Sequence, residues 1–136
     1  MSYKDSKLIL DSGQIALDSA VDGLASFTPG THPYTLRRVT IIVTEATTST
    51  TVDVDIKRRP TAGSTSGEVV IDRVSVPVSS QGVGFFTPEL DTEIKPGEEL
   101  VAEVVNAATA GDGHIVYELE PRWEEPANNT NLTLTA

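Results

Sequence analysis

Polar and apolar residues alternate along several short segments of the chain. The clearest case is residues 51–57, Thr-Val-Asp-Val-Asp-Ile-Lys, in which every second residue is apolar. Because successive side chains of a β-strand point to opposite faces, this period of two indicates a strand with one buried face. Residues 36–44 are rich in β-branched side chains, which favour strands. The pattern therefore predicts a strand in each of the two segments.

The connector between these two segments, residues 45–50, is short, so we expect the strands to pair as an antiparallel hairpin. A buried face selects the register that places all the apolar residues on one side. In that register the pairs are Val39 with Ile56, Ile41 with Val54, and Val43 with Val52.

Further strands are expected along the rest of the chain, separated by turns rich in Gly, Pro, Ser and Thr. Asp11-Ser12-Gly13 reads as a turn between the first two. About eight short strands at this spacing predict an all-β fold, an antiparallel β-sandwich or a closed barrel. The additional segments are residues 7–10, 14–17, 68–78, 82–86, 100–105 and 114–120.

Two segments also fit helical spacing. Residues 98–108 place apolar side chains three and four apart, and residues 14–27 carry a weaker stripe of the same kind. Lys95-Pro96-Gly97-Glu98 has Pro and Gly at the central positions of a turn, which suits entry into a strand. We therefore expect a strand in residues 98–108.

The chain has 136 residues, of which 38% are hydrophobic and none is cysteine. This length fits one domain, expected over residues 1–125, that needs no disulfide. Residues 126–136 are expected to form an extended tail, in which Leu132 and Leu134 alternate with polar residues. The tail is either a frayed terminus or an arm that adds a strand to a neighbouring subunit.

The net charge of −10 and the pI of about 4.5 disfavour nucleic acid and anionic lipid as partners. No apolar run approaches the roughly 20 residues of a membrane helix, so no membrane partner is expected. The charged first ten residues do not resemble a signal peptide, which favours synthesis in the cytoplasm.

No catalytic or cofactor motif is visible, so we expect neither an enzyme nor a cofactor. His32 and His114 lack metal-ligand spacing and are interpreted as structural, so no metal is expected. Asp53 and Asp55 share one strand face, but the alternation places them on a solvated surface. A second acidic cluster, interpreted as solubilising surface, comprises Asp91, Glu93, Glu98 and Glu99.

Half of the ten basic residues lie at the ends of the two central strands. The hairpin register would gather them into a patch that could dock on an acidic neighbour, although acidic residues of other strands could instead neutralise it. Trp123 is either core material or an interface anchor. The candidate basic residues are Arg37, Arg38, Lys57, Arg58 and Arg59.

Turn and strand patterns over most of the chain look familiar: the short charged start, Leu36-Arg37-Arg38-Val39, Ile94-Lys95-Pro96-Gly97-Glu98-Glu99-Leu100, residues 106–113, and Tyr117-Glu118-Leu119-Glu120-Pro121-Arg122-Trp123. In these features the chain resembles the small jelly-roll cement, or decoration, proteins on the capsids of tailed, especially short-tailed, bacteriophages. The resemblance implies an antiparallel β-sandwich that is jelly-roll-like, with eight strands, self-association as a homodimer or homotrimer, and non-covalent docking on the major capsid protein. It also implies a place on the exterior of the virion, after synthesis in the host cytoplasm.

Our first hypothesis is therefore a structural virion protein that stabilises a capsid by bridging its subunits. The alternative is a ligand-binding β-sandwich, such as a carbohydrate-binding module or a phage fibre or adhesin domain. A third hypothesis is a small hydrolase that uses the carboxylates of Asp53 and Asp55.

Overall fold

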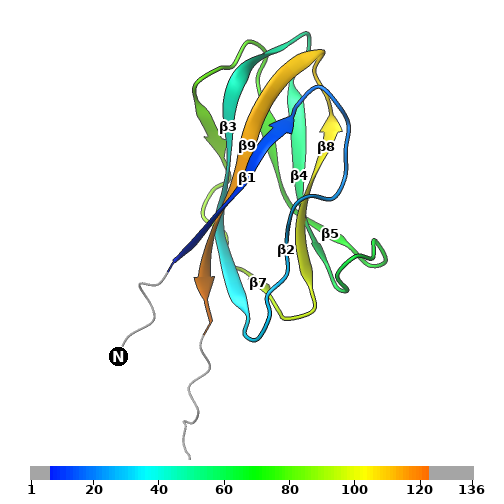
Figure 1. The fold of residues 1–136 in the computed structure, drawn as a ribbon, viewed down its shortest axis with the longest axis vertical. Helices are drawn as coiled ribbons and strands as arrows, with labels where there is room; N and C mark the ends of the chain where they lie inside the picture. The colour runs from blue at the N-terminus through cyan, green and yellow to red at the C-terminus, as the bar shows by residue number, and fades with distance from the viewer. Residues whose placement is uncertain (1–6, 123–136) are drawn as a thin grey trace, which may run out of the picture.

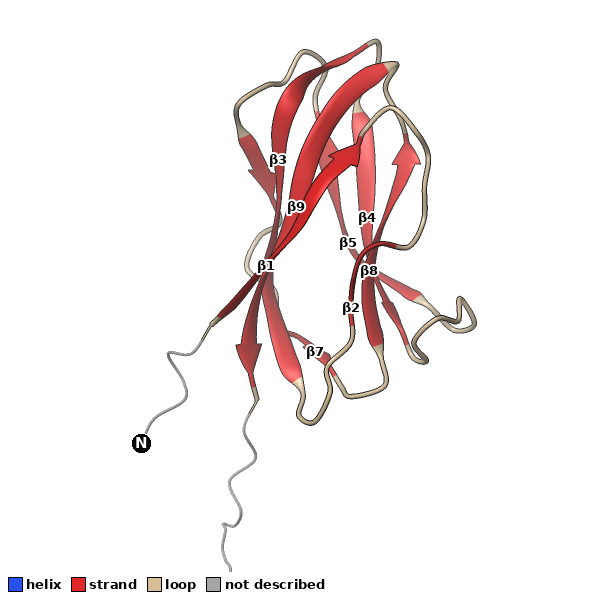
Figure 2. Ribbon diagram, in the orientation of Figure 1, coloured by secondary structure: helices blue, strands red, loops and turns tan. Residues whose placement is uncertain are grey.

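The computed structural model describes residues 7–122, which form strands, turns and loops without a helix (Figure 2). Residues 7–122 contain no helix that is long and apolar enough to cross a membrane. The predictions that involve Trp123, Leu132 and Leu134 lie outside the described residues. The strands are β1 (Leu8–Ala16), β2 (Leu24–Phe27), β3 (Tyr34–Thr48), β4 (Val52–Arg59), β5 (Val69–Val76), β6 (Gly84–Phe86), β7 (Thr92–Ile94), β8 (Glu99–Asn106) and β9 (Ala110–Pro121).

The strands form two antiparallel sheets that pack face to face (Figure 1). Sheet A has the order β1-β9-β3-β6, with β7 also paired to β3, and sheet B has the order β2-β8-β4-β5. The first and last strands are neighbours in sheet A, and successive strands repeatedly cross between the sheets, which is the order of a jelly roll. The predicted all-β sandwich is confirmed, with nine strands where about eight were expected.

The core lies between the two sheets and is built from the residues that point inward in each period of two. In β9, Ile115, Tyr117 and Leu119 are buried, whereas the residues between them are only half-buried. The same alternation makes Leu100, Ala102 and Val104 the core positions of β8 and leaves Val101 on the opposite face. In both strands the period of two therefore determines which side chains enter the core.

The predicted hairpin between residues 36–44 and 51–57 is wrong. The strand β3 pairs with β9, β6 and β7 in sheet A, and β4 pairs with β5 and β8 in sheet B. The short connector crosses from one sheet to the other instead of turning back along the same sheet. Alternation specifies which face of a strand is buried but not which strand lies beside it. The six residues expected to pair are all buried, but they enter one core from opposite sheets: Val39, Ile41, Val43, Val52, Val54 and Ile56.

Asp11-Ser12-Gly13 forms a β-bulge and not a turn, so the two short strands predicted around it are one strand, β1. The register with β9 shifts between Asp11 and Gln14. The Asp11 carboxylate accepts a hydrogen bond from the Gly13 N–H at 2.8 Å, and Gly13 adopts a φ of 76°. The same residues that favour turns also favour bulges, because both need a left-handed backbone position.

Residues 98–108 contain strand β8, as the turn before them predicts. The Glu98 N–H donates to the Lys95 carbonyl at 3.0 Å, and Gly97 has the positive φ, 89°, that the third position of a type II turn needs. The weak helical stripe of residues 14–27 is not a helix: it spans the end of β1 and the short strand β2. The expected loop of residues 106–113 is shorter than predicted, because β9 begins at Ala110.

We expect Gly113→Ala to destabilise the fold, because Gly113 lies where β9 passes closest to β3. A Cβ at Gly113 would lie 2.5 Å from the Ile42 carbonyl oxygen and 3.3 Å from Leu17 Cδ1. Relief requires the two backbones to separate, and overpacking of this kind costs about 1–3 kcal/mol. Urea unfolding measures the loss. Gly30→Ala is the control, because no atom lies within 4 Å of its added Cβ; equal stability of the two variants would contradict the close approach.

Candidate functional site

The basic residues expected to form one patch are separated in the structure. Arg37 donates from Nε to Glu120 at 2.9 Å and from Nη1 to Asp91 at 3.1 Å. The guanidinium of Arg38 lies over the ring of Phe86, 5.0 Å from its centroid, as in a cation–π contact. Both arginines belong to β3 in sheet A, so they do not lie beside the basic residues of β4 in sheet B.

The basic residues of β4 also have acidic or carbonyl partners. Arg58 Nη1 donates to the Glu93 carbonyl at 3.4 Å. Lys57 and Arg59 alternate with the core residue Ile56, so both side chains point to the outer face of sheet B. Both are nevertheless buried. Neutralisation by carboxylates, the alternative weighed from the sequence, therefore describes most of these basic side chains. A role for any of the five basic residues in contacting a partner stays a prediction.

Lys57 is the centre of an ion network on the outer face of sheet B. Its side chain is only 3% exposed, and its Nζ lies 2.8 Å from Glu103, 2.9 Å from Glu68 and 2.9 Å from Asp22. Burial alone would lower the pKa of Lys57, but its hydrogen bonds to Glu103, Glu68 and Asp22 outweigh burial and raise that pKa. The ammonium group therefore remains charged inside the network.

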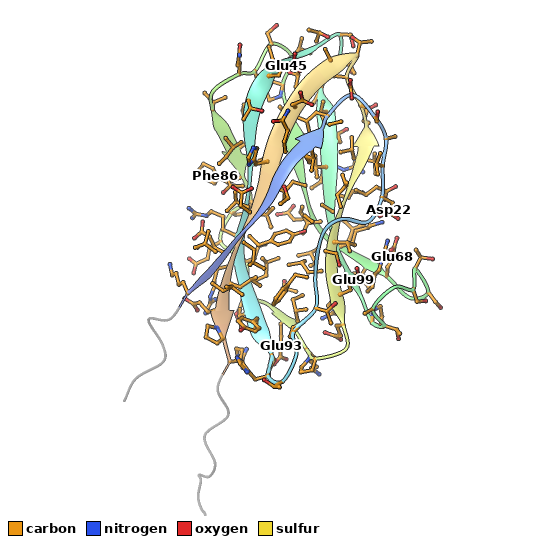
Figure 3. The ribbon with its side chains drawn as sticks, in the orientation of Figure 1. Asp22, Glu45, Glu68, Phe86, Glu93 and Glu99 are labelled. Carbon is orange, nitrogen blue, oxygen red and sulfur yellow. The ribbon has the colours of Figure 1, made fainter. Side chains whose placement is uncertain are left out.

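Arg59 extends the network along β4. Its guanidinium lies 3.1 Å from Glu68, 3.2 Å from Asp22 and 3.3 Å from Glu99. Asp22 comes from the β1–β2 connection and Glu68 from the residues before β5, so the network fastens both segments across the outside of the sheet. Figure 3 shows Asp22, Glu68 and Glu99 on the same side of the molecule. We call these six residues the sheet B ion network: Asp22, Lys57, Arg59, Glu68, Glu99 and Glu103.

The carboxyl groups of Asp22, Glu68 and Glu99 have lowered pKa values. Burial would raise the pKa of Asp22 and Glu99, but hydrogen bonds and ion pairs outweigh it in both cases. For Glu68 the hydrogen bond from Lys57 is the largest cause of the lowered pKa. These carboxylates therefore stabilise the fold above their ordinary pKa values and lose that contribution as the pH falls through the lowered ones.

Other acidic side chains are also engaged in contacts within the fold. Asp55 accepts from Arg73 at 2.6 Å and 3.1 Å, and Asp53 accepts from the Ser75 hydroxyl at 2.7 Å. Asp55 is buried, so the predicted solvated face is wrong at this position: its direct cross-strand neighbour, Arg73, covers it. No cluster of His, Asp or Glu that could hold a metal ion occurs within residues 7–122.

The four-residue acidic cluster predicted near the β7–β8 turn is likewise divided among separate partners. Glu98 accepts a hydrogen bond from the Lys95 N–H at 2.8 Å. Glu99 is buried in the sheet B ion network, so the interpretation as solubilising surface is wrong for this residue. Its neighbour across the sheet, Arg59, is the reason that a carboxylate is stable there.

Both histidines take part in contacts within the fold. The His114 Nδ1 lies 2.9 Å from the Asp11 carboxylate, and the His32 ring stacks on Tyr34 with centroids 5.0 Å apart. The Gly13 N–H and the hydrogen bond with His114 lower the pKa of Asp11. The structural interpretation of the two histidines is consistent with these contacts.

The outer face of sheet A exposes large apolar side chains on three of its strands. Ile9 is 55% exposed, Ile42 39% and Phe86 60%. Cross-strand partners share a face, and the register places Ile9 opposite Glu118, Glu118 opposite Arg38, and Phe86 opposite Thr40. Ile42 is two residues from Thr40 on β3, so all three apolar side chains point outward. We call Ile9, Ile42 and Phe86, with the half-buried Thr40 and Val116 between them, the sheet A face.

The sequence did not reveal the sheet A face. Its three exposed apolar residues lie in segments far apart along the chain, and each could equally have entered the core. Only the strand order β1-β9-β3-β6 places them on one surface. Figure 3 shows Phe86 on the opposite side of the sandwich from Asp22, Glu68 and Glu99.

The sequence matches no protein family and no curated protein. Among solved structures, the chain is similar to one from the Bacillus endospore appendages, a family of disulfide-linked pili, with a TM-score of 0.45 and 12% identity over 91% of this chain and 96% of that one. It is also similar to Eiger TNF from S. frugiperda, with a TM-score of 0.44 and 14% identity over 87% of this chain and 88% of that one. At these scores the two likenesses do not indicate what this chain binds.

We expect Lys57→Met to destabilise the protein at neutral pH, because Glu103, Glu68 and Asp22 would lose their shared cation. Removing one partner of a fully buried ion pair costs roughly 3–5 kcal/mol, and the partial exposure of these carboxylates reduces the expected loss to about 2 kcal/mol. The loss should shrink below about pH 4, where the carboxylates become protonated and need no cation.

Urea unfolding at pH 7 and at acidic pH measures both parts of this prediction. Lys95→Met is the matched control, because Lys95 is exposed in the β7–β8 turn. A loss that is the same at both pH values would show that packing of the lysine stem, and not its charge, is the main contribution.

Proposed function

We propose that this protein is a structural component of a virion, a capsid decoration protein that bridges neighbouring subunits without covalent bonds. The resemblance to phage decoration proteins supports this role, and so does the kind of surface that the fold presents. A decoration protein needs a rigid scaffold and a docking face, and it needs no reaction chemistry. The major capsid protein is the proposed partner, and the capsid exterior is the proposed location.

The single observation that carries the proposal is the group of apolar side chains exposed on the sheet A face. The two central strands of sheet B are covered by charged residues that the chain supplies itself, in the sheet B ion network, and the exposed apolar residue opposite Lys57, Val70, lies on the edge strand β5. Sheet A has no comparable cover among the described residues, and it exposes Ile9, Ile42 and Phe86 on three different strands. A group of exposed apolar side chains with polar residues around it is typical of a protein–protein interface.

The first partner that we propose for the sheet A face is a second copy of the same chain. The face carries both signs of charge next to its apolar centre, with Arg38 directly opposite Glu118 in the β3–β9 register. A self-complementary face of this kind suits closed symmetry, in which the same surface is used by every subunit. The homodimer or homotrimer predicted from the sequence is therefore retained as a proposal.

We expect the purified protein to form a discrete oligomer that the double substitution Ile42→Asp and Phe86→Asp converts to a monomer. Two carboxylates at the centre of the sheet A face would have to be desolvated on association, which is unfavourable. Both side chains are exposed in the folded chain, so the substitutions should leave the fold intact. Native mass by light scattering, over a range of protein concentrations, is the measurement.

The control is Val70→Asp, which adds a charge at an equally exposed apolar residue of β5 in sheet B. This variant should keep the wild-type mass. A wild-type monomer at every concentration, or an oligomer that survives the double substitution, would contradict self-association through the sheet A face. Deleting residues 126–136 in the same assay distinguishes the predicted arm, whose loss weakens the oligomer, from a frayed terminus.

The capsid role is tested by co-sedimentation with capsids assembled from the major capsid protein encoded in the same genome. Binding at a fixed number of copies per capsid, with increased resistance of the capsid to heat, is the expected result. Failure to bind, in a preparation that forms the expected oligomer, would contradict the capsid role but not the self-association.

A further inference from the structure

A crevice opens at one edge of the sandwich, between the edge strand of sheet A, β1, and the edge strand of sheet B, β2. Its volume is about 150 Å³, and β9 forms its floor. Leu10, Phe27 and Ile115 supply apolar walls, and Ser12, Ser26 and Tyr117 supply hydroxyl groups. The crevice is separate from the sheet A face, because Tyr117 and Ile115 point inward from β9.

Both edge strands are irregular at the level of the crevice. The register of β1 shifts between Asp11 and Gln14, and the register of β2 shifts between Leu24 and Phe27. Within β2, Ala25 has a φ of 51°, in the left-handed region that a residue with a Cβ rarely adopts. Bulges redirect side chains and are frequent beside binding and active sites, where strained backbone is also found. Because both irregular edge strands border the same crevice, we interpret the crevice as a specific feature of the fold.

The hydroxyl of Tyr117 is the feature that requires an explanation. Tyr117 is only 2% exposed, and its hydroxyl has no hydrogen-bond partner among the described residues. A buried hydroxyl without a partner is unfavourable, and phenylalanine would fill the same space without that cost. The hydroxyl therefore indicates a hydrogen-bond partner that is not part of this stretch of the chain.

The other polar groups around the crevice already have partners. The Ser12 hydroxyl accepts from the Ile115 N–H at 2.9 Å and donates to the Gly13 carbonyl at 2.7 Å. The Ser26 hydroxyl donates to the Glu99 carboxylate. Asp11 accepts hydrogen bonds from Gly13 and pairs with His114. Among the side-chain hydroxyls that line the crevice, that of Tyr117 is therefore the one without a partner in the described part of the chain.

We propose that the crevice binds a small neutral molecule that has an apolar ring or chain and a single hydroxyl or carbonyl oxygen, which pairs with the Tyr117 hydroxyl. A cavity of roughly 150 Å³ can hold a molecule the size of benzene. A monosaccharide does not fit this chemistry, because most of its hydroxyls would find no free partner. An anion is disfavoured by the carboxylates of Asp11 and Glu99 beside the crevice.

The ionisation of Tyr117 is suppressed by its surroundings. Burial, and then the negative charge of Glu99, raise the pKa of Tyr117 well above its ordinary value. The hydroxyl therefore keeps its proton near neutral pH and is able to donate a hydrogen bond. Binding of a neutral ligand through this group should consequently be independent of pH near neutrality.

The experiment uses phenol and benzene as probes, which differ only in the hydroxyl group, with the full chain and its Tyr117→Phe variant. Chemical shifts of the backbone amides report binding. We expect phenol to bind wild type about fivefold to tenfold more tightly than it binds Tyr117→Phe, which is the effect of one neutral hydrogen bond. Benzene should bind the two proteins equally. The largest shifts should lie in β1, β2 and β9.

Two further variants act as controls. Tyr34→Phe removes the hydroxyl of a tyrosine that does not line the crevice, and should bind phenol as wild type does. Leu10→Phe fills the crevice and should abolish binding of both probes, with thermal unfolding as the check that the variant folds. Equal affinity of phenol for wild type and Tyr117→Phe would overturn the proposal. So would a crystal structure, grown with phenol, in which an ordered water alone occupies the crevice.

Discussion

The position of β9 between β1 and β3 is the constraint on which the rest of the structure depends. The last described strand, β9, pairs with the first, β1, on one side and with β3 on the other, so both ends of the described chain belong to the same sheet. The close passage of β9 along β3 requires a residue without a side chain at Gly113, where any Cβ would meet the Ile42 carbonyl. Because β9 is central, its two faces determine two different features of the molecule. Its inward residues, Ile115 and Tyr117, form the floor of the crevice, and its outward residues, among them Val116, form the middle of the sheet A face.

The distribution of charge follows from the same two-layer arrangement. A sheet in a sandwich has one face toward the core, and its other face must be polar, covered by another segment of the chain, or covered by a partner. Sheet B uses the first two solutions together: Lys57 and Arg59 are covered by carboxylates that come from connections as well as from strands. The two cations Lys57 and Arg59 therefore stabilise the fold of this acidic chain and are not available at its surface. Sheet A retains apolar side chains outside on three strands, with Arg38 over Phe86, and is the face that we propose a partner covers.

The sequence predicts the composition of the core well and the neighbours of each strand poorly. Alternation identified the hydrophobic core residues of β4 and β9, and the Pro-Gly turn correctly favoured a strand for β8. The pairing of β3 with β4 failed, because residues such as Val43 and Val52 satisfy the same alternation whether their strands are side by side or on opposite sides of a core. The short strands β2 and β7 were missed, since three or four residues carry no clear periodic signal, and a register shift also interrupts β2. The sheet B ion network was also out of reach, because Asp22 and Glu68 approach β4 only through connections whose paths alternation does not describe.

The crevice and the sheet A face also differ in what would have revealed them. Exposed apolar residues become meaningful once the strand order is known, whereas the Tyr117 hydroxyl becomes meaningful only when its partners can be counted. A tyrosine on the inward side of a strand is ordinary core material in a sequence, and its ring behaves as such here. Its hydroxyl contributes nothing to packing that phenylalanine would not also provide, and every neighbouring hydroxyl has a partner within the fold. A costly polar group that the fold does not use, beside two bulged edge strands, is more simply understood as part of a binding site than as part of the scaffold.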